Sequence, residues 1–170
     1  IDTDVIFDDV GIPYIPAKRV KGLLTDSFAQ LKEKFKNKNF DLFSDFHISN
    51  FYIDDYENNK KYLKENKIPQ SSVLDYFTNI RRQTTIENGV AKEHSLRTFR
   101  VINSENEFSG DVDIDKDEYL KYFYMVCKNV KRMGTKRNRG LGNVELLLFN
   151  GSKKIEYDIN QITEVLEWVN

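Results

Sequence analysis

The chain has 170 residues, 39% of them hydrophobic, which is enough for one domain with a buried core. Its 26 Lys and Arg nearly balance its 27 Asp and Glu, so the net charge of −1 excludes a uniformly basic protein. The single cysteine excludes an internal disulfide, and no apolar run is long enough to span a membrane. Since no signal peptide is visible either, we expect a cytoplasmic protein.

The first half of the chain divides into segments by its apolar pattern. We expect a strand at 3–7, an extended segment at 11–17, a helix at 18–36, a strand at 46–54 and a surface excursion at 55–70. Two prolines, Pro13 and Pro16, disfavour helix in the residues before them. Apolar residues then recur every three or four positions from Val20 to Phe35, which is typical of an amphipathic helix.

The second half begins with a predicted hairpin. We expect two strands within 78–103, a strand at 107–114, a helix at 116–132, a strand at 144–149, and a short strand at 154–159 followed by a helix at 162–169. The pair Asn88-Gly89 is a strong turn signal. Because the hairpin is polar and basic, it has little core to cover and we expect it to project. Asp115 is placed to cap the helix and Gly134 to terminate it.

This order of elements predicts an α+β fold. Two amphipathic helices over an antiparallel sheet indicate a ferredoxin-like core, with its first strand missing ahead of Ile1. We expect one domain at 1–150 and a strand-helix extension at 151–170.

The segment GTKRNRGLG (134–142) is the first candidate site. Six cations and no acid lie between Lys128 and Arg139, so a local positive field is hidden by the balanced total. Glycines let backbone N–H groups approach an anion closely, and long cationic side chains contact phosphates. The residues concerned are Gly134, Lys136, Arg137, Arg139, Gly140 and Gly142. The pattern is not a Walker A loop, and a solvated basic turn is the alternative.

A second basic group lies at the start of the first predicted helix. Lys18, Arg19 and Lys21 occupy the end of the helix where the macrodipole already favours anions. Cations are therefore unfavourable at this end of the helix, and a bound anion would offset that cost. The alternative is a charged turn paired with local acids such as Asp26.

The chain start carries the acids Asp2, Asp4, Asp8 and Asp9. Near a phosphodiester, carboxylates hold hydrated Mg²⁺ or orient a ribose hydroxyl. Solvated acids are the alternative. The two histidines, His47 and His94, lack the spacing of metal ligands.

The ordered set of these segments resembles the RAMP superfamily of CRISPR-associated proteins. The similar stretches, which cover most of residues 1–149, are IDTDVIFDDVGIPYIPAKRVKGLL, IRRQTTIENGVAKEHSLRTFRVI, EFSGDVDI and GTKRNRGLGNVELL. The closest likeness is to single-domain subunits of type III antiviral effectors, particularly the type III-D RAMP subunit.

The resemblance implies a ferredoxin-like fold, related to the RNA-recognition motif, that assembles along a CRISPR RNA with other RAMP subunits. It implies guide-RNA contacts from the helix start and the glycine-rich loop. The hairpin would be the thumb that pushes between guide and target bases, with Arg81, Arg82 and Thr84 in it. This chain departs from the family pattern after the proline-containing turn, where a small Ser-Ser pair is usual and Lys18-Arg19 stands here.

In RAMP subunits that cut target RNA, an Asp at the position of Asp2 serves catalysis with a divalent metal. Other members bind without cutting, so we expect no tightly bound cofactor, and Mg²⁺ only if this chain cuts. Three functions therefore stay open: an RNA-binding subunit of a ribonucleoprotein, a metal-dependent endoribonuclease that uses Asp2, and a ferredoxin-like domain whose basic face binds an acidic protein.

Overall fold

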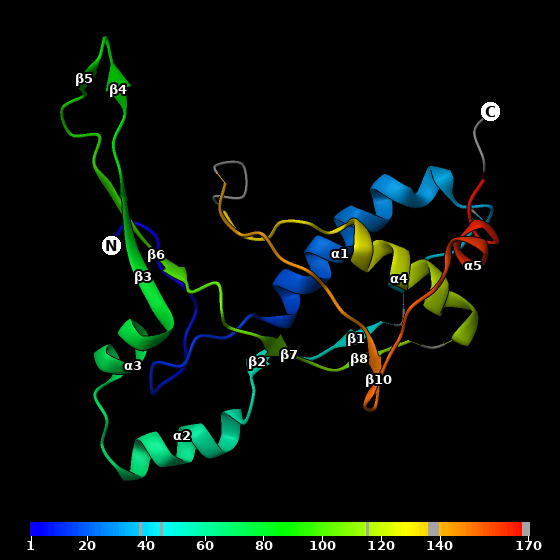
Figure 1. The fold of residues 1–170 in the computed structure, drawn as a ribbon, viewed down its shortest axis with the longest axis horizontal. Coiled ribbons are helices and arrows are strands. Elements are labelled where there is room, and N and C mark those ends of the chain that lie inside the picture. The colour runs from blue at the N-terminus through cyan, green and yellow to red at the C-terminus, as the bar shows by residue number, and fades with distance from the viewer. Residues whose placement is uncertain (38, 45, 115, 136–139, 168–170) are drawn as a thin grey trace. The chain divides into compact units, whose positions relative to one another are not determined.

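The computed structural model, shown in Figure 1, describes the chain except for residues 38, 45, 115, 136–139 and 168–170. The chain forms two compact units, residues 1–16 with 50–111, and residues 17–49 with 112–170. Both contain helices and short antiparallel strands, which confirms the predicted α+β class. None of the helices in the described part of the chain is long and apolar enough to span a membrane.

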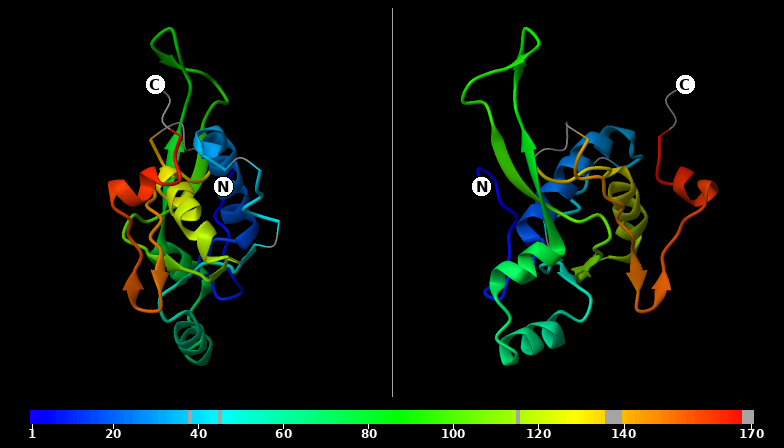
Figure 2. Two further views of the ribbon diagram at one scale, coloured as in Figure 1. Left: turned by 90° about the vertical axis from the view of Figure 1, so that its right-hand side faces the viewer. Right: turned by 60° about the vertical axis from the view of Figure 1, so that its left-hand side comes forward.

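The first unit is built around a long hairpin. Its elements are β2 (Tyr52–Ile53), α2 (Tyr56–Glu65), α3 (Gln70–Phe77), β3 (Thr78–Gln83), β4 (Ile86–Glu87), β5 (Val90–Ala91), β6 (Arg97–Ile102) and β7 (Phe108–Ser109). β3 pairs with β6 in antiparallel register, and β4 pairs with β5 across the turn at Asn88-Gly89. Both turn residues have positive φ, 52° and 78°, as a two-residue hairpin turn requires. The predicted hairpin is confirmed, and Figure 2 shows it extending away from α3.

Helices α2 and α3 close the opposite end of this unit. A core of Val10, Ile12, Ile53 and Val73 is covered by half-buried side chains that include Leu63 of α2. The segment at 55–70 lies at the surface as predicted, but the sequence analysis did not predict that most of it forms the helix α2. Its contacts with the core stabilise a helix that its own Asn-rich sequence favours only weakly.

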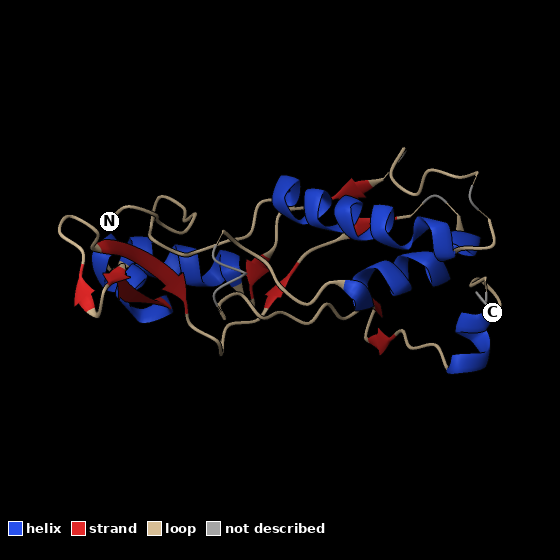
Figure 3. Ribbon diagram, turned by 90° about the horizontal axis from the view of Figure 1, so that it is seen from above, coloured by secondary structure: helices blue, strands red, loops and turns tan. Residues whose placement is uncertain are grey.

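The second unit is held by two helices that pack on each other, as Figures 1 and 3 show. Its elements are α1 (Ala17–Leu31), the 3₁₀ turn η1 (Lys32–Lys34), β1 (His47–Ile48), β8 (Val112–Asp113), the 3₁₀ turn η2 (Asp117–Tyr119), α4 (Leu120–Asn129), β9 (Phe149–Asn150), β10 (Lys153–Lys154) and α5 (Ile159–Thr163). The hydroxyl of Ser27 in α1 donates to the carbonyl oxygen of Val126 in α4 at 2.8 Å. Asn129 donates to the same hydroxyl oxygen at 3.1 Å, so α4 ends beside the C-terminal half of α1.

The two packed helices, α1 and α4, are both shorter than predicted. α1 gives way to a 3₁₀ turn and then to extended Phe35, whose ring is fully buried. α4 ends at Asn129, five positions ahead of Gly134, because residues 131–133 instead pair with 142–144. The expected cap, Asp115, lies outside the described residues.

The strands expected at 46–54 and 107–114 are each broken into two. β1 pairs with β8 in the second unit, and β2 pairs with β7 in the first. One break lies at Gly110, where a Cβ would come within 2.7 Å of the Phe51 ring. Both breaks coincide with the positions where the chain passes between its two units.

Within the predicted strand at 144–149, only the last residue, Phe149, pairs with another described strand. β9 pairs with β10, whereas the preceding residues alternate between half-buried and exposed side chains without a ladder in the described part of the chain. α5 begins earlier than the predicted helix, because Asp158 and Gln161 form a reciprocal capping box. A ferredoxin-like sheet, a strand ahead of Ile1 and a boundary at residue 150 stay predictions.

Candidate nucleic-acid interface

The glycine-rich loop is closed at its base by backbone hydrogen bonds. The N–H of Met133 donates to the carbonyl oxygen of Gly142 at 2.8 Å, and the N–H of Val144 donates to that of Lys131 at 3.1 Å. An antiparallel bridge joins Arg132 to Asn143 between them. The sequence analysis identified the glycines and cations of this loop as a candidate site, but it did not predict that backbone hydrogen bonds close the loop. Three of its predicted RNA contacts, Lys136, Arg137 and Arg139, lie outside the described residues.

The three glycines of the loop have different surroundings. Gly142 has φ 72°, and a Cβ there would lie 1.8 Å from the carbonyl oxygen of Met133. Gly134 and Gly140 also have positive φ, 101° and 79°, but a Cβ on either would meet no described atom within 4 Å. Gly142 is therefore required by the closure of the loop, whereas the backbone at Gly134 and Gly140 is open to an approaching ligand.

The cations at the start of α1 are not equivalent. Lys18 and Arg19 are exposed and make no ion pair within the described part of the chain. Lys21 is half-buried: its ammonium group donates to the carbonyl oxygen of Phe46 at 3.2 Å and lies 5.8 Å from the centre of the Phe46 ring. The structure thus gives Lys21 a role in holding residue 46 on the helix, and it leaves Lys18 and Arg19 facing solvent. It describes no pairing of these cations with Asp26.

The predicted thumb residues lie in the other unit, on the hairpin. Arg81 and Arg82 are exposed neighbours on β3, so they project to opposite faces of the ribbon. The Thr84 and Ser95 hydroxyl oxygens are 2.7 Å apart across the neck of the hairpin. Thr84 therefore helps to hold the two strands together.

The first two acids of the chain are attached to β6. The carboxylate of Asp2 accepts the N–H of Thr98 at 2.7 Å, and this bond, helped by the charge of Arg97, lowers the pKa of Asp2. Asp4 lies 3.2 Å from Nε of Arg100, an ionic contact in which the N–H is not directed at the oxygen. The described residues contain no group of three or more His, Cys, Asp or Glu that could hold a metal ion. Catalysis by Asp2 with Mg²⁺ stays a prediction.

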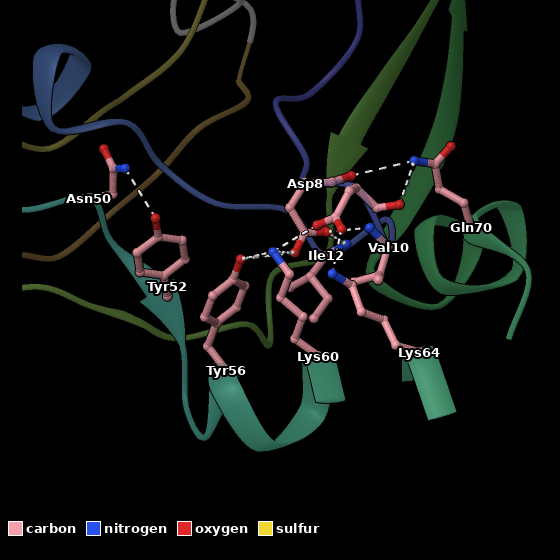
Figure 4. Close-up of polar contacts among 10 residues, drawn as sticks. Asp8, Val10, Ile12, Asn50, Tyr52, Tyr56, Lys60, Lys64 and Gln70 are labelled. Atoms are coloured by element: carbon pink, nitrogen blue, oxygen red, sulfur yellow. Dashed lines mark hydrogen bonds and ion pairs between the residues drawn. The ribbon is translucent and has the colours of Figure 1, made fainter. Parts of the chain in front are cut away.

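The other two acids, Asp8 and Asp9, attach the chain start to α2, and Figure 4 shows the contacts of Asp8. One carboxylate oxygen of Asp8 accepts the N–H groups of Val10 at 3.0 Å and Ile12 at 2.9 Å. The other oxygen accepts the Tyr56 hydroxyl at 2.9 Å and lies 3.2 Å from the Lys60 ammonium group. Asp8 thus orders the turn that carries Ile12 into the core. Its partners on α2, Tyr56 and Lys60, lie about fifty positions away, so no local pattern could indicate these two contacts.

Asp9 lies between two lysines of α2. Its carboxylate oxygens are 2.7 Å from Lys60 and 2.7 Å from Lys64. Hydrogen bonds from Lys60 and Lys64 lower the pKa of Asp9 to about 2, and the bond to Asp9 is the main reason that the pKa of Lys60 is raised. Burial is the main reason that the pKa of Tyr56 is raised. These acids therefore have structural partners and do not form an open acidic cluster.

The lowered pKa of Asp9 predicts a loss of stability in acid. Because the folded pKa is below the ordinary 3.8, the stabilisation is present above pH 3.8 and disappears as the pH falls toward 2. The unfolding temperature of the wild type should therefore fall more steeply over this window than that of Asp9→Asn. Since the side chain is more than half exposed, we expect the difference to be small and to shrink in salt.

Thermal unfolding at several pH values would check this, with Glu93→Gln in the exposed hairpin as the control. Parallel curves for wild type and Asp9→Asn would show that the two lysines do not stabilise the carboxylate.

Exposed cations at a helix start, on a hairpin and at the flanks of a glycine-closed loop are typical of a protein that binds a polyanion. A family model of the RAMP superfamily matches residues 1–145, and the chain belongs to that superfamily. A comparison with curated proteins found no match. Membership indicates a CRISPR-associated, RNA-binding role.

Proposed function

We propose that this chain is an RNA-binding subunit of a type III CRISPR effector complex, most similar to the type III-D RAMP subunit, and that it holds CRISPR RNA by its backbone. The observation that carries the proposal is the glycine-rich loop. Its base is fixed by hydrogen bonds and by Gly142, while Gly134 and Gly140 present backbone that no described atom covers. The sequence between these two open glycines supplies Lys136, Arg137 and Arg139.

A second surface of the same unit supports this function. Lys18 and Arg19 at the start of α1 are exposed and belong to the same compact unit as the loop. Phosphates carry the same charge whatever the base, so contacts of this kind hold RNA without reading its sequence. Such contacts suit a subunit that must accept any guide.

The family resemblance extends the proposal to partners. We expect other RAMP subunits and target RNA to contact this chain, with Arg81 and Arg82 of the hairpin near the RNA. Lys21 would act indirectly, since it is already bonded to Phe46.

The proposal predicts weaker, still sequence-independent binding in Lys18→Ala/Arg19→Ala. Loss of two phosphate contacts should reduce the slope of log affinity against log salt by about 1.4 for single-stranded RNA. The measurement is fluorescence anisotropy with labelled RNAs of equal length and unrelated sequence, in a salt series. Wild type should bind these RNAs with similar affinity.

The matched control is Lys61→Ala/Lys153→Ala, which removes two exposed cations from elsewhere on the chain. An equal loss in the control would show that only net charge matters. Strong preference for one RNA sequence would contradict backbone binding.

A further inference from the structure

An open groove in the first unit has a chemistry unlike that of the basic sites. It has a volume of about 750 Å³ and lies between α2, α3 and residues 105–107. Its floor is apolar, with Ile12 fully buried and Val73 nearly so. Two tyrosines that help line it, Tyr62 and Tyr76, are 62% and 77% exposed. Large exposed aromatic side chains above an apolar floor are characteristic of a protein-binding surface.

The rim of the groove is acidic. Asp54, Glu105 and Glu107 line it and form no ion pair with any described residue, and none of the described residues that line the groove is Lys or Arg. An RNA phosphate would be repelled here, whereas a cationic ligand would gain favourable charge interactions. The groove therefore does not extend the candidate RNA interface.

The wall formed by residues 105–107 is held in place by hydrogen bonds from Asn106 and from the nearby Asn103. Asn106 donates to the carbonyl oxygen of Phe77 at the end of α3, at 3.2 Å. Asn103 donates to the carbonyl oxygen of Tyr76 at 3.0 Å. Because this wall is tied directly to α3, the groove is formed before any ligand arrives, which lowers the entropic cost of binding.

We propose that this groove docks a segment of another protein that carries apolar side chains flanked by Lys or Arg. Apolar side chains would cover the exposed Ile68 and the half-buried Leu63 and Phe77, which line the groove with the two tyrosines. The flanking cations would pair with Glu105 and Glu107. The groove is open to solvent, which suits a peptide segment better than a small molecule enclosed on all sides. The proposal does not depend on the RNA-binding function, since it uses no residue assigned to RNA.

The test uses the full chain, labelled with ¹⁵N, and two synthetic amphipathic helical peptides. One carries leucine on one face with lysine on its flanks, and the other replaces each lysine with glutamate. The lysine peptide should shift the amide resonances of Tyr62, Val73 and Tyr76 and should bind at least about tenfold more tightly than the glutamate peptide. Equal binding of the two peptides, or shifts spread over other acidic surfaces, would overturn the proposal.

Three variants sharpen the test. Tyr76→Ala removes an exposed ring, and Glu107→Lys reverses one rim charge; each should weaken the lysine peptide about fivefold or more. Glu93→Lys, which makes the same charge change on the exposed hairpin, should not. Unchanged binding in Tyr76→Ala would contradict the groove as the site.

Two further measurements exclude other occupants. RNA added in place of peptide should leave the resonances of Tyr62, Val73 and Tyr76 unshifted, and RNA affinity should be the same in Tyr76→Ala as in wild type. Sedimentation of the chain alone should show no self-association through the groove. Self-association that is lost in Tyr76→Ala would assign the groove to a second copy of the chain and overturn the proposal.

Discussion

Replacing Gly142 with alanine is expected to disrupt the base of the glycine-rich loop and to weaken RNA binding by about tenfold or more. The backbone there has φ 72°, a conformation that costs about 1–2 kcal/mol for a residue with a Cβ. The new Cβ would also lie 1.8 Å from the carbonyl oxygen of Met133, so the backbone must move. Movement would break the hydrogen bond from Met133 to Gly142, and we expect the loop base to lose roughly 2–4 kcal/mol in total.

The control for this substitution is Gly140→Ala in the same loop. Gly140 also has positive φ, 79°, but a Cβ there meets no described atom within 4 Å. Gly140→Ala should therefore cost only the conformational free energy of about 1–2 kcal/mol. Hydrogen exchange at the amides of Met133 and Val144 would compare the two variants directly. If those amides stay as protected in Gly142→Ala as in Gly140→Ala, the hydrogen bonds do not close the loop in the way described.

Local signals predicted the parts of the fold that depend on local chemistry. The turn at Asn88-Gly89 requires positive φ at two positions, and few residue pairs other than this one meet that requirement. The apolar stripe of α1 begins where predicted, because the prolines before it disfavour helix. Such features need no knowledge of distant residues.

Contacts between distant parts of the chain explain the failures. The residues of α2 look like a charged loop, yet Asp8 and Asp9, about fifty positions away, bind Tyr56, Lys60 and Lys64 on one face of that helix. Local signals of a helix were weak: Tyr56 and Leu63 are seven positions apart, and Lys61 and Glu65 form an opposite-charge pair four positions apart.

The candidate site was predicted in its composition but not in its construction. The glycines and cations of the loop could be read from the sequence, since their chemistry suits phosphate. That Gly142 serves closure, while Gly134 and Gly140 leave the backbone open, depends on where Met133 lies. Likewise, nothing local shows that Lys21 is bonded to Phe46 while Lys18 and Arg19 are exposed. The acidic rim of the groove combines Asp54 with Glu105 and Glu107, which only the folded unit brings together.

The loop cations are expected to supply the largest share of RNA affinity. Lys136/Arg137/Arg139→Ala removes three positive charges from the sequence between Gly134 and Gly140. If each cation contacts one phosphate, the slope of log affinity against log salt should fall by about 2 for single-stranded RNA, with a corresponding loss of affinity at low salt. The matched control, Lys34→Ala/Lys61→Ala/Lys153→Ala, removes the same charge from exposed positions elsewhere.

The affinity of wild type, loop variant and control for one CRISPR RNA across a salt series is therefore the most direct test of RNA binding by this loop. We predict a steep slope for wild type and control, and a slope lower by about 2 for the loop variant. Equal slopes in all three proteins, or no dependence on salt in wild type, would contradict the account.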